Sequence, residues 1–99
     1  MDDIRAKVLR NEYEFSKHAV DRAILRHISV AEIGEAVENG EIIEDYPNDK
    51  YGPSCLILGF TDAGRPLRLQ ITHPGQPILK LITVYDPDPA EWEDFRERR

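Results

Sequence analysis

Apolar residues recur at helical spacing along the chain up to Gly40. The spacing is weak over residues 2–12 and clear over residues 16–28 and 30–38. In the middle segment four apolar positions are expected to turn into a core: Val20, Ala23, Ile24 and Ile28. The pattern therefore predicts two or three helices in this part of the chain.

Serines precede both of the clearly helical segments. Ser16 is the expected N-cap of the first, and Ser29 of the second, where Glu32 completes an S-x-x-E capping box. The second helix is expected to end at Asn39-Gly40, with a residue able to adopt a positive φ. The residues directly before Ser16, Tyr13–Phe15, are predicted to be a short extended piece.

After Gly40 the pattern changes to that of strands. Four are predicted, over residues 41–46, 54–61, 66–73 and 78–85, with turns at Asp62-Ala63-Gly64 and Pro74-Gly75-Gln76-Pro77. Residues 90–98 are predicted to form a short helix docked by Trp92 and Phe95. The expected fold class is α+β: two or three N-terminal helices packed on a four-stranded antiparallel sheet, with a short C-terminal helix, in a single domain of residues 1–99.

The net charge of −6 argues against a nucleic-acid binder, because such proteins are usually basic. The acidic residues are concentrated, however. Residues 30–50 carry a net charge of −6 and residues 84–99 one of −3, whereas residues 1–29 carry +1 and residues 51–83 carry +2. An acidic chain can therefore still present a cationic cleft, or its acidic segments can simply be solvated faces.

Other classes of function are disfavoured by what the chain contains. Its longest apolar runs are far too short to cross a membrane. Its one cysteine, Cys55, lies in an apolar run and is expected in the core, and the cytoplasm is the expected location. The histidines show no metal-ligand spacing, so neither a metal nor a cofactor is expected.

The segment from Ser16 to Ser29 carries the strongest chemical signal. His18, Arg22 and Arg26 are spaced four apart and share an arc roughly 80° wide on the predicted helix. Forked guanidinium donors can hold phosphate oxygens, and an imidazole with a pKa near 6.5 can accept or donate a proton. Such a row suits the binding, and potentially the cleavage, of a phosphodiester.

Structural alternatives exist for each of these three residues. His18 could tie the start of the helix to the sheet through its ring nitrogens. Arg22 and Arg26 could pair with acidic residues of the sheet such as Asp45 or Glu44. The sequence leaves both interpretations open.

Three residues of the predicted strands complete the candidate site. Arg68 and Lys80 alternate onto a strand face that can look toward the same cleft, where they would bind substrate. Tyr85 could donate a proton or stack on a base. The alternatives are exposed sheet cations for Arg68 and Lys80, and a ring buried in the core for Tyr85.

Four sequence elements carry a resemblance to a known family. They are S-x-H-A-x-x-R-x-x-x-R-x-I-S, E-I-x-x-A-x-x-x-G-E-I-I-E-x-Y, G-R-P-L and I-T-V-Y-x-P. From about Phe15 to Pro87 the chain resembles the bacterial and archaeal family known as domain of unknown function 4258, which is grouped with the RelE-like toxin superfamily (HigB, BrnT and MqsR relatives). The resemblance implies a RelE-like fold and the toxin component of a bacterial type II toxin–antitoxin system.

The resemblance also implies a metal-independent mRNA endonuclease, acting on free mRNA or on the ribosome. In that chemistry the RNA 2′-hydroxyl attacks the adjacent phosphorus, so the site needs a base, cations and an acid. The residues implied for catalysis are His18, Arg22, Arg26 and Tyr85, with Arg68 and Lys80 for substrate. The implied partner is a cognate antitoxin, in many members a YgiT-type protein with a zinc-binding motif.

The chain departs from the family pattern at one position. The strand after G-R-P-L commonly carries a histidine where this chain has Arg68, so an acid or base is either lost or replaced by His18. Two other hypotheses therefore stay open: a non-catalytic RNA- or protein-binding module on the same fold, and an interaction protein anchored by Trp92 of the acidic C-terminal segment.

Overall fold

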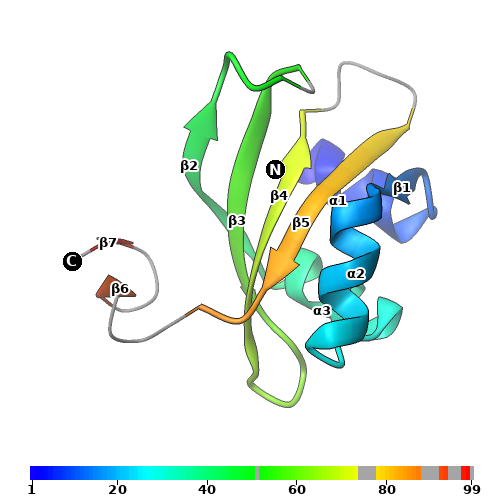
Figure 1. Ribbon diagram of the computed structural model, residues 1–99, viewed down its shortest axis with the longest axis vertical. Helices are drawn as coiled ribbons and strands as arrows, with labels where there is room; N and C mark the ends of the chain where they lie inside the picture. The colour runs from blue at the N-terminus through cyan, green and yellow to red at the C-terminus, as the bar shows by residue number, and fades with distance from the viewer. Residues whose placement is uncertain (51, 74–77, 88–91, 94–96, 99) are drawn as a thin grey trace.

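Three helices cover one face of a five-stranded sheet (Figure 1). The computed structural model describes residues 1–50, 52–73, 78–87, 92–93 and 97–98. The helices are α1 (Asp2–Leu9), α2 (Lys17–Leu25) and α3 (Val30–Glu38). The strands are β1 (Tyr13–Phe15), β2 (Glu41–Tyr46), β3 (Ser54–Phe60), β4 (Pro66–Thr72) and β5 (Leu79–Tyr85), with a separate pair of β6 (Trp92–Glu93) and β7 (Glu97–Arg98).

The sheet is mixed, and not the four-stranded antiparallel sheet that the sequence predicted. Its strand order is β1-β5-β4-β3-β2. Strands β2 to β5 form the predicted antiparallel meander, and β1 adds to β5 in parallel, with Tyr13 opposite Leu79 and Phe15 opposite Leu81. The rings of Tyr13 and Phe15 pack against the core. This contact explains why a three-residue segment pairs with a strand distant in sequence.

The core lies between the helices and one face of the sheet. The buried sheet residues on this face are Cys55, Ile57, Leu67, Leu69, Ile71, Leu79, Leu81 and Val84. The predicted placement of Cys55 is confirmed, and burial raises the pKa of its thiol to about 11. A thiol that stays protonated at neutral pH is a poor nucleophile, so Cys55 is a packing residue.

Helix α2 rests on the sheet through small residues. Ala23 and, beyond the helix, Ile28 join the core as predicted. Ala19, which was not among the predicted core positions, is buried with them. The prediction that Val20 and Ile24 face the core is wrong, because these side chains are 40% and 70% exposed. At about 100° per residue they are turned aside from the line through the two alanines.

The predicted helix starts are confirmed. The Ser16 hydroxyl accepts a hydrogen bond from the Ala19 N–H at 3.0 Å and donates one to the Ile82 carbonyl at 2.7 Å, which fixes the start of α2 on β5. Ser29 and Glu32 form the predicted capping box at the start of α3. These bonds satisfy N–H groups that have no partner within a helix.

Two glycines allow α3 to lie very close to β3. A Cβ added to Gly59 would lie 1.7 Å from the Ala36 carbonyl oxygen, and one added to Gly40 would lie 2.6 Å from the same atom. Gly40 was expected to supply a positive φ, but the residues with positive φ lie elsewhere in the chain. The structure therefore requires Gly40 for close approach, and not for its backbone conformation.

The predicted C-terminal helix is wrong where it can be compared. Residues 92–93 and 97–98 form the antiparallel pair β6–β7. The remainder of that prediction, residues 90, 91 and 94–96, lies outside the described part of the chain, as does the docking role of Phe95.

We predict that Gly59→Ala destabilises the protein by about 3 kcal/mol or prevents folding, because the new methyl group would overlap the α3 backbone. Gly34→Ala in α3 is the matched control. A Cβ at Gly34 meets open space, so this variant should gain up to about 1 kcal/mol from helix propensity. Urea denaturation measures both, and equal stability of the two variants would contradict the close approach.

Candidate functional site

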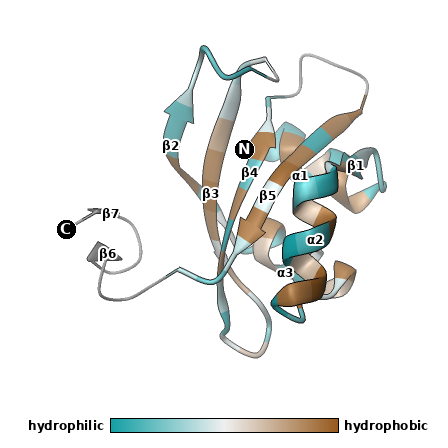
Figure 2. Cartoon of the chain, in the orientation of Figure 1, coloured by the Kyte–Doolittle hydropathy of each residue, from teal (hydrophilic) through white to brown (hydrophobic). Residues whose placement is uncertain are grey.

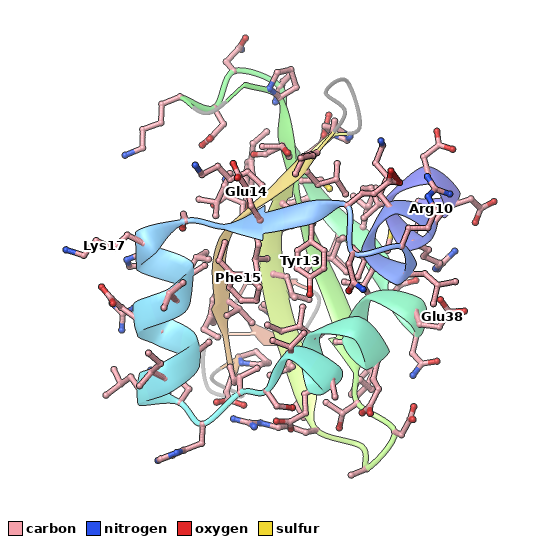
Figure 3. The ribbon with its side chains drawn as sticks, turned by 90° about the vertical axis from the view of Figure 1, so that its right-hand side faces the viewer. Arg10, Tyr13, Glu14, Phe15, Lys17 and Glu38 are labelled. Carbon is pink, nitrogen blue, oxygen red and sulfur yellow. The ribbon has the colours of Figure 1, made fainter. Side chains whose placement is uncertain are left out.

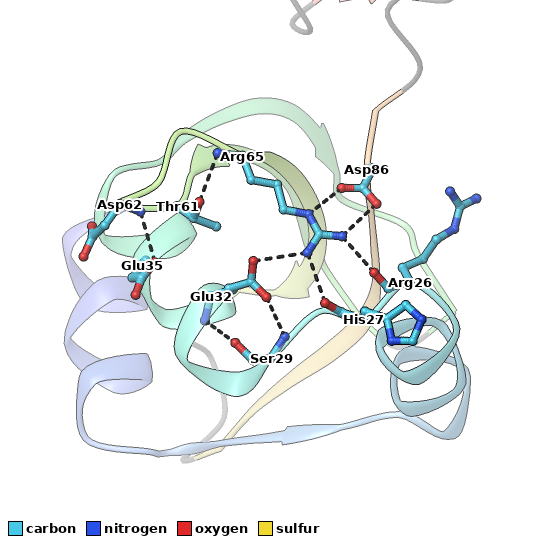
Figure 4. A network of polar contacts seen from close by, with 9 residues as sticks. All are labelled: Arg26, His27, Ser29, Glu32, Glu35, Thr61, Asp62, Arg65 and Asp86. Carbon is cyan, nitrogen blue, oxygen red and sulfur yellow. Dashed lines mark hydrogen bonds and ion pairs between the residues drawn. The ribbon is translucent and has the colours of Figure 1, made fainter.

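The candidate site is the cationic flank of α2, formed by His18, Arg22 and Arg26. His18 and Arg26 are exposed and Arg22 is half-buried. Arg26 lies just beyond the helix as its C-cap, and Figure 4 shows its guanidinium extending away from the neighbouring polar network. Within the described part of the chain, none of the three side chains makes a hydrogen bond or an ion pair. They are therefore available to a ligand.

The structural alternatives for these residues do not hold in the structure. The anchor of α2 is Ser16, whereas His18 points to solvent. Asp45 contacts His73, and Glu44 accepts a hydrogen bond from the Tyr46 hydroxyl. Both carboxylates lie on β2, at the edge of the sheet opposite to the β1–β5 edge on which α2 packs. They are consequently not the partners of the α2 arginines.

Arg68 and Tyr85 do not join the cationic flank. They lie opposite each other on β4 and β5. Their strand neighbours Leu69 and Val84 face the helices, so Arg68 and Tyr85 belong to the other face of the sheet. Arg68 is fully buried there. The expectation that this strand face looks toward the same cleft as α2 is therefore wrong.

Lys80 also lies away from α2. Its ammonium group is 3.7 Å from a carboxylate oxygen of Glu14, its register partner on β1. The position agrees with the alternative of an exposed sheet cation. Of the six predicted site residues, the structure thus keeps His18, Arg22 and Arg26 together.

A residue that the sequence reasoning missed holds this region in place. The guanidinium of Arg65, the residue just before β4, binds both carboxylate oxygens of Asp86 at 2.8 and 3.1 Å (Figure 4). It also donates to the Glu32 carboxylate at 3.1 Å and to the carbonyls of Arg26 at 2.8 Å and His27 at 3.1 Å. One side chain thereby connects the end of α2, the start of α3 and the end of β5.

The backbone at the end of α2 explains why these carbonyls are accessible. His27 has a φ of 54°, the left-handed conformation that often terminates a helix. The N–H groups of His27 and Ile28 bond back to the carbonyls of Ile24 and Ala23. The carbonyls of Arg26 and His27 remain without such partners and are taken by Arg65. Arg65 is the arginine of the G-R-P-L element, so the residue itself was visible in the sequence. Its role could not be predicted, because its partners are distant along the chain.

The network shifts the protonation equilibria of its members. The hydrogen bonds with Asp86, and then with Glu32, raise the pKa of Arg65. The pKa of the Glu32 carboxyl is lowered from its ordinary value of 4.5, first by the hydrogen bond from the Ser29 N–H and then by Arg65. Glu32 is therefore ionised in the folded protein at neutral pH.

A second histidine, His73, has a defined partner. Nε2 of His73, just after β4, lies 2.5 Å from an Asp45 carboxylate oxygen on β2. The contact joins the ends of two strands far from α2. In the described residues no group of three or more His, Cys, Asp and Glu side chains could hold a metal ion.

The comparison with protein families supports one part of the resemblance, the domain of unknown function. The family described as Domain of unknown function (DUF4258) matches residues 15–86. The chain belongs to the DUF4258 family. No curated protein and no solved structure matches the chain. None of the described helices of this DUF4258 domain is both long and apolar enough to cross a membrane.

The limits of the match coincide with features of the structure. It begins at Phe15, the last residue of β1, and ends at Asp86, the carboxylate that binds Arg65. The matched segment of the DUF4258 domain thus contains the cationic flank, the Arg65 network and the whole antiparallel meander. It leaves out α1 and the C-terminal pair of strands.

We predict that Arg65→Lys lowers the free energy of unfolding by about 2 kcal/mol, because a single ammonium group cannot reach two carboxylates and two carbonyls together. Arg10→Lys is the matched control. Arg10 forms an exposed ion pair with Glu12, so its change should stay within about 0.5 kcal/mol. Urea denaturation distinguishes the two, and a similarly small effect at Arg65 would contradict the role of the network.

Acidification should weaken the same network through Glu32. Because the folded state lowers the pKa of this carboxyl, its contribution is complete above the ordinary value of 4.5 and is lost as pH falls through the lowered value. Glu32→Gln keeps a capping-box side chain but removes the charge. Between pH 7 and pH 3 the melting temperature of the variant should therefore fall less than that of the wild type.

Thermal melting at a series of pH values tests this. Glu38→Gln removes an exposed carboxylate from the same helix without touching Arg65, and it is the charge-matched control. If Glu32→Gln loses as much melting temperature on acidification as the wild type, Glu32 does not contribute to acid stability.

Proposed function

We propose that the chain is the RelE-like toxin component of a bacterial type II toxin–antitoxin system. It would act in the cytoplasm as an mRNA endonuclease that needs no metal ion. The observation that carries the proposal is the cationic flank of α2. There an exposed imidazole stands in a row with two guanidinium groups that no described carboxylate neutralises. The family's resemblance to RelE-like toxins supplies the reaction.

The residues of the flank fit the parts of that reaction. His18 would take the proton of the RNA 2′-hydroxyl or donate one to the leaving 5′-oxygen. Arg22 and Arg26 would hold the phosphate oxygens and stabilise the charge that develops on them. Arg68, Lys80 and Tyr85 take no part in the proposed site, because they lie away from α2.

His18 lies in the first turn of α2, where its exposed ring can reach a bound phosphodiester. The proposed partners are mRNA, free or on the ribosome, and a cognate antitoxin, such as a YgiT-type protein, that would cover the cationic flank.

A second candidate is a non-catalytic RNA- or protein-binding module on the same fold. One observation favours it: the structure separates Arg68 and Tyr85 from His18. Among the described residues, the cationic flank therefore has one group that can transfer a proton, whereas the cleavage reaction needs both a base and an acid. A module of this kind would bind RNA through Arg22 and Arg26 and leave it intact.

Mapping mRNA 5′ ends distinguishes the two candidates. The purified protein is added to a bacterial cell-free translation extract with a reporter mRNA, and in parallel to purified mRNA with EDTA. We expect discrete cuts that are lost by about 100-fold or more in His18→Ala and strongly reduced in Arg22→Ala. Lys17→Ala removes an exposed cation from another side of α2 and should leave the cuts unchanged.

The remaining outcomes each have a consequence. Cuts that persist in His18→Ala would show that the site is assigned to the wrong residues. Intact mRNA in both assays would contradict the nuclease. In that case binding of labelled RNA that Arg22→Ala weakens would support the non-catalytic module.

A further inference from the structure

The face of the sheet that points away from the helices, here called the far face, is buried as well. Along β3, Leu56 and Leu58 alternate with the core residues Cys55 and Ile57, so they lie on the far face. Arg68, the register partner of Leu58 on β4, lies there with them. Leu56, Leu58 and Arg68 are 3%, 2% and 0% exposed, although none of them belongs to the core under the helices. Another part of the chain must therefore cover them.

None of the described helices supplies this cover. The helices lie on one side of the sheet (Figure 1), and Figure 3, seen from that side, shows α2 and α3 in front of the strands. Figure 2 shows hydrophobic stretches in β3 and β5, and such a sheet requires a second layer to exclude water from its other face. The pair β6–β7 lies on the side of the sheet away from the helices (Figure 1). The described part of the C-terminal segment is therefore on the side of the far face.

The C-terminal segment, residues 88–99, begins at the far face. Tyr85, at the end of β5, is the register partner of Arg68, and Pro87, two residues further on, is buried. Two strand spacings of about 4.8 Å separate β5 from β3, and about three extended residues span that distance. The segment is consequently long enough to cross from β5 over Arg68 to β3.

The composition of the C-terminal segment matches that of the far face. Residues 88–95 carry four carboxylates and no basic side chain. A guanidinium buried as deeply as that of Arg68 is stable only with negative charge or other polar groups close to it. The same stretch contains Trp92 and Phe95, large apolar residues of the kind that pack on leucines. Charge and hydrophobicity therefore both favour this segment as the cover.

We infer that residues 88–99 fold back across the far face of the sheet, where their carboxylates neutralise Arg68. The far face is buried within one chain, so neither a second copy nor a partner protein is required to cover it. A segment attached to the sheet is also present at a high effective concentration, which disfavours an external competitor. Trp92 then anchors the domain internally and is not presented to a partner. The far face lies across the sheet from α2, so this inference does not depend on the proposed nuclease.

Tryptophan fluorescence of the full chain tests the cover, because Trp92 is its single tryptophan. A synthetic peptide of residues 86–99 serves as the exposed reference. We expect the folded chain to emit at shorter wavelength than the peptide and to be quenched by acrylamide several times less. Emission and quenching equal to those of the peptide would overturn the inference. Protection of Trp92 that disappears on dilution would overturn it too, because a second copy would then supply the cover.

A double-mutant cycle tests whether the segment lies on Arg68. The neutral-segment variant removes the four carboxylates of residues 88–95 through Asp88→Asn, Glu91→Gln, Glu93→Gln and Asp94→Asn. We expect these changes to lower the melting temperature of the wild type by roughly 5 °C or more. In an Arg68→Met background the same changes should have little effect, because the positive charge that the carboxylates neutralise is gone.

Lys80→Met is the matched control background. Lys80 is a cation of β5 that lies beside Glu14, at the β1 edge of the sheet. In this background the neutral-segment changes should lower the melting temperature as much as in the wild type. Equal losses in the Arg68→Met and Lys80→Met backgrounds would contradict the pairing with Arg68.

The neutral-segment variant also tests the inference without any change in the sheet. Its substitutions lie outside the helices and the five-stranded sheet, so the variant should fold. We expect acrylamide to quench its Trp92 more strongly than that of the wild type. Unchanged quenching together with an unchanged melting temperature would show that the carboxylates do not hold the segment on the far face.

Discussion

The guanidinium of Arg65 fixes the corner at which the cationic flank ends and the C-terminal segment begins. It binds two carboxylates and two carbonyls that come from three separate parts of the chain (Figure 4). The carbonyls belong to the end of α2 and the carboxylate of Glu32 to the first turn of α3. Arg65 therefore links the end of α2 directly to the start of α3. The position of Arg26 at the end of the cationic flank is held by the same contacts.

Close packing through small residues determines what the two helices expose. Gly59 and Ala36 bring the backbone of α3 onto β3, and Ala19 and Ala23 let α2 lie near β5. A helix that contacts the sheet through alanines has little room for a larger residue beneath it. Val20 and Ile24 are consequently left at the side of α2. Their exposure is thus a consequence of how tightly the helices pack.

Features determined by nearby residues could be predicted from the sequence, and those determined by distant residues could not. The caps at Ser16 and Ser29 and the limits of the four long strands depend on local patterns, and the structure reproduces them closely. The parallel pairing of β1 and the partners of Arg65 link residues far apart in the chain. The core side of α2 was predicted correctly at Ala23 and wrongly at Val20 and Ile24, because hydrophobicity favoured the larger residues whereas steric fit selects the alanines.

In the candidate site, too, the local features could be predicted and the long-range ones could not. The spacing of His18, Arg22 and Arg26 is a property of one helix, so their common flank could be predicted. Strand alternation correctly separated Arg68 from Leu67 and Leu69, but it could not tell which face of the sheet the helices cover. The helices cover the face with the leucines, and Arg68 lies on the other face. The chemistry proposed for α2 therefore depends on the residues of this helix and its C-cap. An endonuclease that used only this flank would require His18 to serve as both base and acid, or a water or substrate group to supply the second proton transfer.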